Sequence, residues 1–408
     1  MMSERGDRPA PYTQTKRIFL STGEISGDLQ GSFLVTALQT QAIARGLTLE
    51  IVALGGQRMQ QAGARTLDDT TAIGSMGLIE SLPFIFPTLA VQRRAKRYLK
   101  ANPPDATVLI DYMTPNMVIG RYLRETYPTS PVVYYIAPQA WVWQENESVT
   151  RRIVACCDRI IAVFAAEATY YRQAGAKTNY FGHPLIDTYP KPLDRDAARR
   201  RCHVPDDRTI VALLPASRQQ ELKYIMPPMF AAAQRLQERA RQDGQRELEF
   251  WIPLSQPRFR PSIEKALRFY RLNARFVPSD DLTLLAACDL ALTKSGTVNL
   301  ELALMGVPQV VVYALHPFTS WVLRRLLKFE IPFASPVNLV LMREVLPELL
   351  QELATPDRIF RSALELLYDD DRRSRMQLEY AEMRSVMGSE GVCDQVANSV
   401  LDSLCGSD

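Results

Sequence analysis

The stretch at residues 289–313 constrains the fold of this chain more than any other. It begins with an apolar run at 290–292, breaks at a turn of small residues at 295–297, and continues as an apolar segment that stops at Gly306, with Pro308 just beyond. Glycine followed closely by proline is a usual end of a helix, and the apolar run at 310–312 predicts a second buried strand. Strand, turn, helix and strand form a βαβ unit, which requires a parallel sheet.

The turn of this unit is a natural seat for phosphate, because the first N–H groups of a helix have no partner within it. Glu301 lies about one helical turn after Thr297 and on the same face. A carboxylate there could accept hydrogen bonds from a ribose whose phosphates rest on Ser295, Gly296 and Thr297. The alternative stays open that Thr297 is an ordinary helix cap and Glu301 a first-turn acid.

Length and composition exclude several classes of protein. The 408 residues are too many for one hydrophobic core and suit two domains, and a net charge of +3 gives no reason to expect nucleic acid as a partner. The six cysteines show no CxxC spacing, so we expect reduced thiols in a cytosolic protein. Residues 1–15 lack the apolar core of a signal peptide and are expected to form a disordered arm, and no apolar run is long enough to span a bilayer.

The first half of the chain predicts a doubly wound sheet. Strands are expected at 17–21, 49–54, 107–110, 132–136 and 159–164, and a glycine-bearing turn at 23–28 follows the first of them. Open α/β sheets bind ligands at the carboxyl ends of their strands, so Glu24, Ser26 and Asp28 are candidates for a ligand site, with helix capping as the alternative. No Gly-x-Gly-x-x-Gly occurs, and a nicotinamide or flavin cofactor is therefore not expected.

The second half repeats this pattern after a segment at 187–207 that is rich in Pro, Asp and Arg and is the best linker candidate. Further strands are expected at 209–214 and 248–252, and helices at 261–270 and 281–287. Arg218 follows the first of these strands, where a guanidinium could hold phosphate groups. A surface arginine at a helix start is the alternative. We expect two doubly wound α/β domains, at 16–190 and 191–360, with a cleft between them, and C-terminal helices at 361–408 that would pack back on the first domain.

An apolar segment beside a basic one stands out at 78–97. Pro83 and Pro87 lie within the apolar part at a spacing that does not suit a regular buried helix, and Arg93, Arg94, Lys96 and Arg97 follow. Apolar side chains next to basic ones favour insertion at an anionic membrane surface, with a buried helix followed by a solvated one as the alternative. The apolar residues of this membrane patch are Leu78, Ile79, Leu82, Phe84, Ile85, Phe86 and Leu89.

Taken together, the motifs resemble those of the lipid-A-disaccharide synthase family, glycosyltransferases with two Rossmann-like domains of the GT-B type. The resemblance covers residues 16–400 and keeps the order of the motifs: Gly23-Glu24-Ile25-Ser26-Gly27-Asp28, Ile110-Asp111, 138–143, Gly182-His183-Pro184, 213–221, Ser295-Gly296-Thr297 with Glu301, and Asn338 with 343–348. It implies transfer of 2,3-diacylglucosamine from UDP to 2,3-diacylglucosamine 1-phosphate, with a β-1,6 bond formed by inversion at the anomeric carbon and release of UDP. It implies no metal and no other cofactor.

The resemblance also implies roles for individual residues. Asp111 ends a strand at the edge that faces the predicted cleft, where burial would raise its pKa, so we expect it to be the catalytic base. His183 is a rival base, and helix capping by Asp111 stays open. Trp141 and Trp143 would point in opposite directions in an extended segment, with one of them facing the cleft. The residues implied for the UDP-sugar are Arg218, Glu221, Ser295, Gly296, Thr297, Glu301, Asn338 and Arg343, and those for the acceptor are Glu24, Ser26, Asp28 and Trp143.

The implied partners are UDP-diacylglucosamine and a lipid X-type acceptor, at the cytoplasmic face of the inner membrane, with a homodimer left open. The sequence departs from the family pattern after Asp111, where only Asn116 is kept, at Ala216 in place of glycine, and at Lys294 in place of a small residue. These departures leave open a paralogous transferase with another lipid acceptor and a binding protein without catalysis. The two-domain architecture leaves open an enzyme like UDP-N-acetylglucosamine 2-epimerase.

Overall fold

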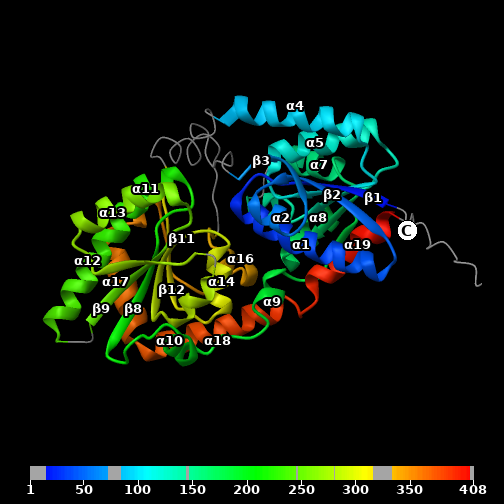
Figure 1. Ribbon diagram of the computed structural model, residues 1–408. Coiled ribbons are helices and arrows are strands. Elements are labelled where there is room, and N and C mark those ends of the chain that lie inside the picture. Colours follow the sequence, from blue (N-terminus) through cyan, green and yellow to red (C-terminus); the bar gives the residue numbers. More distant parts are fainter. Residues whose placement is uncertain are drawn as a thin grey trace, which may run out of the picture.

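Two parallel sheets, one from each half of the chain, form the framework of the protein (Figure 1). The structure is a computed structural model that describes residues 15–71, 84–143, 147–244, 247–279, 281–315 and 333–404. The expected arm at 1–15 lies almost entirely outside these residues. So do Leu78, Ile79 and Leu82 of the membrane patch.

The first sheet has the strand order β3-β2-β1-β4-β5-β6-β7, and all of its pairs are parallel. Every residue of β4 is buried, as expected for a strand covered by helices on both faces. The strands are β1 (Thr15–Ser21), β2 (Thr48–Gly55), β3 (Arg65–Asp69), β4 (Ala106–Ile110), β5 (Val132–Tyr135), β6 (Arg159–Ala162) and β7 (Thr178–Tyr180).

The second sheet has the order β10-β9-β8-β11-β12-β13 and is also entirely parallel. In both sheets the order reverses beside the first strand, between β1 and β4 and between β8 and β11. These are the switch points at which open α/β sheets hold ligands. The strands are β8 (Arg208–Leu214), β9 (Glu247–Pro253), β10 (Ala274–Val277), β11 (Leu290–Lys294), β12 (Gln309–Tyr313) and β13 (Glu348–Leu350).

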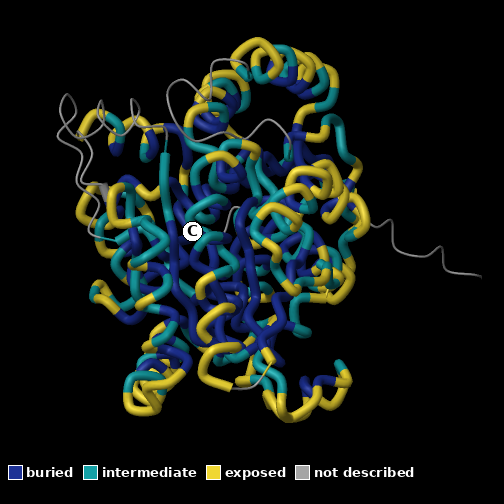
Figure 2. The backbone as a smooth tube through the Cα atoms, turned by 90° about the vertical axis from the view of Figure 1, so that its left-hand side faces the viewer, coloured by how far each residue is buried: buried dark blue, intermediate teal, exposed yellow. Residues whose placement is uncertain are grey.

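Helices cover the sheets, so that the buried backbone in Figure 2 follows the strands and the exposed backbone follows the outer faces of the helices. The longer helices are α1 (Ile25–Ala44), α4 (Ile85–Ala101), α5 (Met113–Thr126), α7 (Glu147–Ala155), α8 (Ala165–Gln173), α12 (Met226–Gln242), α13 (Arg260–Phe269), α17 (Pro356–Tyr368), α18 (Asp370–Val386) and α19 (Val392–Leu404). The shorter ones are α2 (Gln57–Gln61), α6 (Ala140–Trp143), α9 (Leu185–Thr188), α10 (Arg195–Arg201), α11 (Gln219–Tyr224), α14 (Val298–Leu304) and α16 (Pro336–Leu341). Three 3₁₀ helices are described, η2 (Pro257–Phe259), η3 (Leu282–Ala287) and η4 (Gln351–Leu353).

The helix expected at 281–287 is present, as the 3₁₀ helix η3. One local expectation was wrong. Trp141 and Trp143 lie in the helical turn α6 where an extended segment was predicted. Trp141 is buried, with its ring 5.8 Å from the ring of Phe164, and the side chain of Trp143 is outside the described part of the structure.

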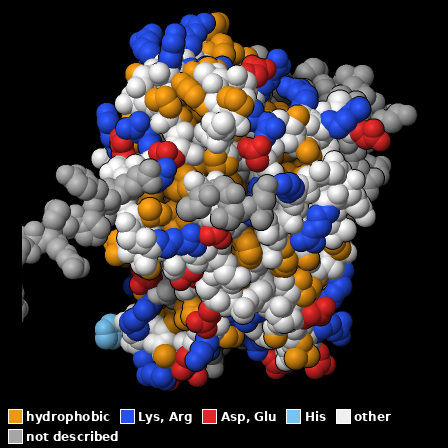
Figure 3. Space-filling model, turned by 90° about the vertical axis from the view of Figure 1, so that its right-hand side faces the viewer, with side chains coloured by type: hydrophobic (Ala, Val, Ile, Leu, Met, Phe, Trp, Pro, Cys, Tyr) orange, Lys and Arg blue, Asp and Glu red, His pale blue; other side chains and the backbone are white. Residues whose placement is uncertain are grey.

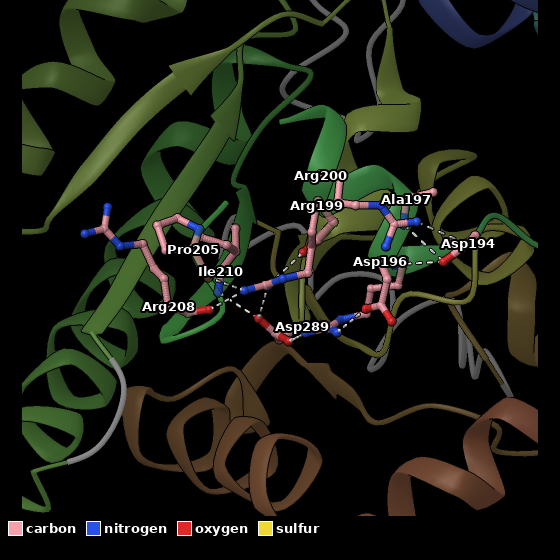
Figure 4. A network of polar contacts seen from close by, with 11 residues as sticks. Asp194, Asp196, Ala197, Arg199, Arg200, Pro205, Arg208, Ile210 and Asp289 are labelled. Atoms are coloured by element: carbon pink, nitrogen blue, oxygen red, sulfur yellow. Dashed lines mark hydrogen bonds and ion pairs between the residues drawn. The ribbon is translucent and has the colours of Figure 1, made fainter. Parts of the chain in front are cut away.

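The segment that links the two sheets is held to the second sheet by the carboxylate of Asp289, which precedes β11 (Figure 4). This carboxylate accepts hydrogen bonds from Arg199 on α10 at 3.2 Å and from the backbone N–H of Ile210 in β8 at 2.8 Å. Arg195 adds a second ion pair to it. Arg199 is almost fully buried and also donates to the carbonyls of Pro205 and Arg208. The Arg-rich linker therefore has a structural purpose, because its arginines satisfy buried carbonyls and a carboxylate.

The chain returns to the first sheet at its C-terminal end. α18 runs from the second half toward the first, and α19 packs along α1 and against β4 (Figure 1). Arg45, which ends α1, pairs with Asp402 and donates to Asn398, both on α19. The two halves are thus joined both by the linker at 187–207 and by the α18–α19 segment.

The described part of the membrane patch lies on α4, a helix at the edge of the molecule (Figure 1). Pro83 lies outside the described residues, and Pro87 does not prevent this helix, because it falls in the first turn, where an N–H would have no helical partner. α4 is buried only along one side, by Val91, Gln92, Ala95 and Leu99. Within the described residues, no helix is both long enough and apolar enough to cross a membrane.

Candidate active site

The candidate site lies where the switch points of the two sheets meet. In the first sheet, the turn at 23–28 follows β1 and Asp111 follows β4. In the second sheet, Arg218 follows β8 and the turn at 295–297 follows β11. An ion pair joins the two halves here, because Nη2 of Arg218 lies 2.6 Å from Oε2 of Glu24. The predicted acceptor and donor motifs are therefore brought together at one place.

The loop that carries Asp111 is held in an unusual backbone conformation. Asp111 and Tyr112 both have positive φ, 47° and 50°, which residues other than glycine rarely adopt. The carbonyl of Asp111 accepts hydrogen bonds from Nδ2 of Asn116 and from the hydroxyl of Tyr134, each at 2.8 Å. The ring of Tyr112 lies against the backbone of Gly23, where any Cβ would collide with it. The loop is thus fixed to both neighbouring strand ends, which orients the Asp111 carboxyl.

The carboxyl of Asp111 does not cap a helix. α5 begins after Tyr112, and no side-chain hydrogen bond caps it. The pKa of Asp111 is raised to about 7, first by burial and then by the nearby carboxylate of Glu24, while the N–H of Tyr112 and the charge of Arg218 lower it in part. A carboxyl with a pKa near neutrality can accept a proton during a reaction and release it afterward.

Glu221 shapes the loop that presents Arg218. Its Oε2 accepts hydrogen bonds from the backbone N–H groups of Ser217 and Arg218, which makes it the third residue of a capping box at the start of α11. Glu221 is buried, so it acts on the site through its charge and through the position of Arg218.

Polar groups of the turn after β11 already form hydrogen bonds within the chain, which the sequence did not indicate. The N–H of Gly296 donates to Oδ1 of Asn299 at 2.8 Å, and the hydroxyl of Ser295 donates to the carbonyl of Ala334 at 2.6 Å. The N–H of Gly296 is therefore not free for phosphate. Thr297 precedes α14 but makes no side-chain cap bond there.

Glu301 is buried beside the linker between the two halves. Its Oε1 accepts a hydrogen bond from the hydroxyl of Tyr189 at 3.2 Å. Burial raises the pKa of Glu301 to about 7, against the hydrogen bond from Tyr189 and the charges of Arg58 and Lys294. Glu301 is thus not a solvated first-turn acid, and its carboxyl can exchange the tyrosine hydroxyl for another donor.

His183 is buried at the junction between the first sheet and the C-terminal segment. Its backbone N–H donates to the carbonyl of Met387, its Nδ1 accepts the N–H of Leu185 at 3.2 Å, and its ring lies 5.6 Å from that of Phe164. Burial lowers the pKa of His183 to about 3, so the imidazole is neutral at neutral pH. Because Nδ1 already accepts a hydrogen bond, the ring has a structural use at this junction.

Three predicted site residues have their side chains occupied within the chain. Asn338 is buried and uses both ends of its amide, donating to Leu346 and Glu348 and accepting from the N–H groups of Val345 and Leu346. Arg343 forms ion pairs with Glu379 and Glu382 on α18. Asp28 accepts the N–H groups of Gly56, Arg58 and Met59 at the start of α2. Their binding roles stay predictions that these contacts do not favour.

Other residues of the site were not identified from sequence. Tyr112, Tyr134 and Tyr189 contact Asp111 or Glu301, yet their spacing gives no pattern that could have indicated this. Glu167 is buried near Asp111, caps α8 through the N–H groups of Val163 and Phe164, and has a pKa that burial raises to about 8. Ser26 lies half-buried in the first turn of α1.

Two doubly wound parallel sheets with charged groups at facing switch points define a protein of the GT-B fold. Solved structures that share it include a UDP-N-acetylglucosamine 2-epimerase from Neisseria meningitidis bound to UDP-GlcNAc, with 12% identity, a TM-score of 0.57, and coverage of 96% of this chain and 100% of that one. CalG4, the calicheamicin glycosyltransferase, has 16% identity, a TM-score of 0.55, and coverage of 96% and 98%. At such identities the likeness concerns the fold alone.

Sequence relatives define the family. The family model described as lipid-A-disaccharide synthetase matches residues 18–399. The lipid-A-disaccharide synthase of Gloeothece citriformis is 48% identical over 386 residues, which are 95% of this chain and 99% of that protein. The protein of the same name from Synechocystis sp. is 48% identical over 392 residues, or 96% and 98% of the two chains. The chain therefore belongs to the lipid-A-disaccharide synthase family, which confirms the resemblance seen in its motifs.

Proposed function

We propose that the protein transfers 2,3-diacylglucosamine from UDP to 2,3-diacylglucosamine 1-phosphate and forms the β-1,6 disaccharide with release of UDP. Membership of the family supports this reaction. The observation that carries it is the placement of Asp111, with a pKa near 7, across from Arg218, with the ion pair between Arg218 and Glu24 joining the two halves. A base and a phosphate-binding cation on facing sheets are what an inverting displacement needs.

In the proposed reaction the acceptor lies on the first sheet and UDP on the second. The 6-hydroxyl oxygen of the acceptor attacks the anomeric carbon, and Asp111 takes its proton. The bond between that carbon and the diphosphate oxygen breaks, and UDP leaves with the electron pair. Arg218 stabilises the negative charge that develops on the diphosphate. Glu301 would accept hydrogen bonds from the ribose. When the donor binds, the ion pair between Glu24 and Arg218 would break, and Arg218 would bind the diphosphate.

Asp111 is a better candidate for the base than His183. The imidazole of His183 is neutral, as a base requires, but its Nδ1 is already used and its pKa near 3 makes it a weak proton acceptor. The pKa of Asp111 lies near the working range, and its loop is strained in the manner of functional sites.

We also propose that the protein works at the cytoplasmic face of the inner membrane, as a peripheral protein attached through α4. The exposed apolar residues at the start of this helix and the basic residues after them support the attachment. Figure 3 shows several Lys and Arg side chains at the top of the molecule, the end at which α4 lies, and others over the rest of this face. The homodimer stays a prediction.

The reaction is tested by incubating the protein with UDP-2,3-diacylglucosamine and 2,3-diacylglucosamine 1-phosphate and following both products by mass spectrometry. We expect the disaccharide phosphate and UDP in equal amounts. Conversion of UDP-N-acetylglucosamine to its 2-epimer, without transfer, would show an epimerase instead. UDP binding without any turnover would contradict the enzymatic proposal. Transfer to a different lipid acceptor would place the chain among paralogous transferases.

A further inference from the structure

Lys294 is a charged side chain at the centre of the site that the proposed reaction has not used. It is the last residue of β11, beside Thr293, which pairs with Leu214 at the end of β8 just before the Arg218 loop. Its amine folds back over the backbone of Gly296, where the Cβ of any other residue would collide with it. Lysine and glycine therefore fit each other at this turn, and the amine is held in the site rather than directed to solvent.

The charges that surround this amine come from both halves of the chain. They are the carboxylates of Glu221, Glu24 and Glu301 and the guanidinium of Arg218. Each carboxylate already has a partner: Glu24 pairs with Arg218, Glu221 accepts two backbone N–H groups, and Glu301 accepts the hydroxyl of Tyr189.

Within the part of the chain that the structure describes, Lys294 has no such partner. Among the described residues, its amine forms no ion pair or hydrogen bond, since the nearby carboxylates act on it only at longer range. Burial accordingly lowers the pKa of Lys294 below its ordinary value, although Glu221, Glu24 and Glu301 oppose this. A desolvated cation without a partner is costly to keep in a folded protein, which points to an anionic ligand that completes it.

We propose that Lys294 is a second diphosphate-binding cation, which acts together with Arg218 on the phosphates of the UDP-sugar and on the UDP that leaves. The proposal rests on the proposed function, because it takes the donor to be a UDP-sugar. Its chemistry is complementary to that of Arg218: a compact ammonium point charge from one strand end beside a planar guanidinium from the next. The N–H of Gly296 already donates to Asn299 and is not free for phosphate. The Lys294 amine therefore supplies the positive charge at this turn instead.

The test compares the binding of UDP and of uridine, which lacks the phosphates, by titration calorimetry with no acceptor present. Lys294→Met should weaken UDP binding roughly 10- to 100-fold and leave uridine binding within about twofold of wild type, because a charged hydrogen bond to phosphate is lost. Lys294→Arg, which keeps the charge, should retain most of the UDP affinity. Lys265→Met on α13, an exposed lysine of the same half, is the matched control and should bind UDP like wild type.

Thermal unfolding without ligand shows whether the variants fold. Lys294→Met should unfold at or above the wild-type temperature, because it removes a desolvated charge, while the rise in Tm that UDP causes should shrink. An unchanged UDP affinity in Lys294→Met would overturn the assignment, as would an equal loss for UDP and uridine, which would indicate general damage. If the wild-type protein itself does not bind UDP, the proposed function fails as well, and this is visible without any variant.

Discussion

The proposed base and two residues close to it have left-handed backbone angles. Besides Asp111 and Tyr112, Ile136 after β5 has a φ of 57°, and its carbonyl accepts the N–H of Asp111 at 2.9 Å. Such angles cost roughly 1–3 kcal/mol for each residue and persist where the surrounding contacts enforce them. Here Asn116 and Tyr134 supply those contacts. The backbone strain is therefore concentrated around the carboxyl of Asp111, the proposed base.

At the same scale, Glu301 should govern the binding of UDP. Glu301→Ala removes a buried carboxylate proposed to accept hydrogen bonds from the ribose, and UDP affinity should fall by roughly 1.5–3 kcal/mol. Tyr189→Phe, which deletes only the hydroxyl that contacts Glu301, should change it by about 1 kcal/mol or less. Calorimetric titration with UDP measures both. A folded Glu301→Ala variant that binds UDP as wild type does would remove Glu301 from the site.

At the scale of elements, sequence pattern was sufficient for the parallel sheets and for the strand ends that carry the site. Apolar runs closed by small or polar residues located β1, β4, β8 and β11, because strands buried on both faces leave such runs. The pattern did not indicate which polar side chains form hydrogen bonds or ion pairs within the folded chain. Asn338 and Arg343 match the family motif, yet their partners come from 345–348 and from α18, contacts that only the folded chain reveals.

The same limit applies to α4. Proline spacing argued against a regular buried helix, yet the cost of proline depends on its position within a helix, and Pro87 lies in the first turn of the partly exposed α4. Likewise, the segment with Trp141 and Trp143, expected to be extended, forms the turn of helix α6 shortly after β5. Local propensity is weakest in short connections such as these, where tertiary contacts decide the conformation.

The exposed start of α4 should bind the protein to anionic membranes. Phe86 is 80% exposed, Ile85 45% and Leu89 43%, whereas Phe84 is half-buried. The double variant Ile85→Ser, Phe86→Ser should lose most of its co-sedimentation with vesicles that contain anionic lipid, because apolar area available for insertion is removed. Its Tm should change little, since neither side chain is part of the core.

The matched control for this experiment is Phe269→Ser. Phe269 is 76% exposed but lies on α13 in the other half of the protein, so its loss should not alter vesicle binding. Equal binding by wild type and the double variant would contradict the attachment through α4. Loss of the fold in the double variant would show that the two residues support the structure of α4 instead.

At the scale of the whole molecule, the return of the chain to the first half couples the two sheets. Asp187, on α9 at the start of the linker, accepts the N–H groups of Gly391, Val392 and Cys393 at 2.7, 3.1 and 2.7 Å. It thereby caps α19, the helix that packs on α1. The Asp187 carboxylate thus connects the linker at 187–207 with the α18–α19 segment, the two segments of chain that join the halves. We keep a domain boundary near residue 190 as a proposal.

Removal of this cap should destabilise the protein as a whole. Asp187→Ala should lower the free energy of unfolding by roughly 1–3 kcal/mol, because three N–H groups at the start of α19 lose their acceptor. Asp402→Ala breaks only the exposed pair with Arg45 on the same helix and should cost less than about 1 kcal/mol. Urea unfolding measures both. An equal loss of unfolding free energy in the two variants would show that the Asp187 cap stabilises the junction no more than an exposed ion pair does.

A base on the first sheet is proposed to act across from phosphate-binding cations of the second, and the pH dependence of disaccharide formation is the decisive test of this arrangement. The measurement is kcat/KM for disaccharide formation from about pH 5 to about pH 9, for wild type and Asp111→Asn. Because the pKa of Asp111 is raised to about 7, the base form is lost as the pH falls. We expect the wild-type rate to drop roughly tenfold per pH unit on the acidic side and to be level above the pKa. Asp111→Asn should be roughly 10²- to 10⁴-fold slower, without that acidic limb and with UDP affinity little changed. An Asp111→Asn variant that turns over at the wild-type rate, with His183→Ala inactive, would contradict the account and make the histidine the base.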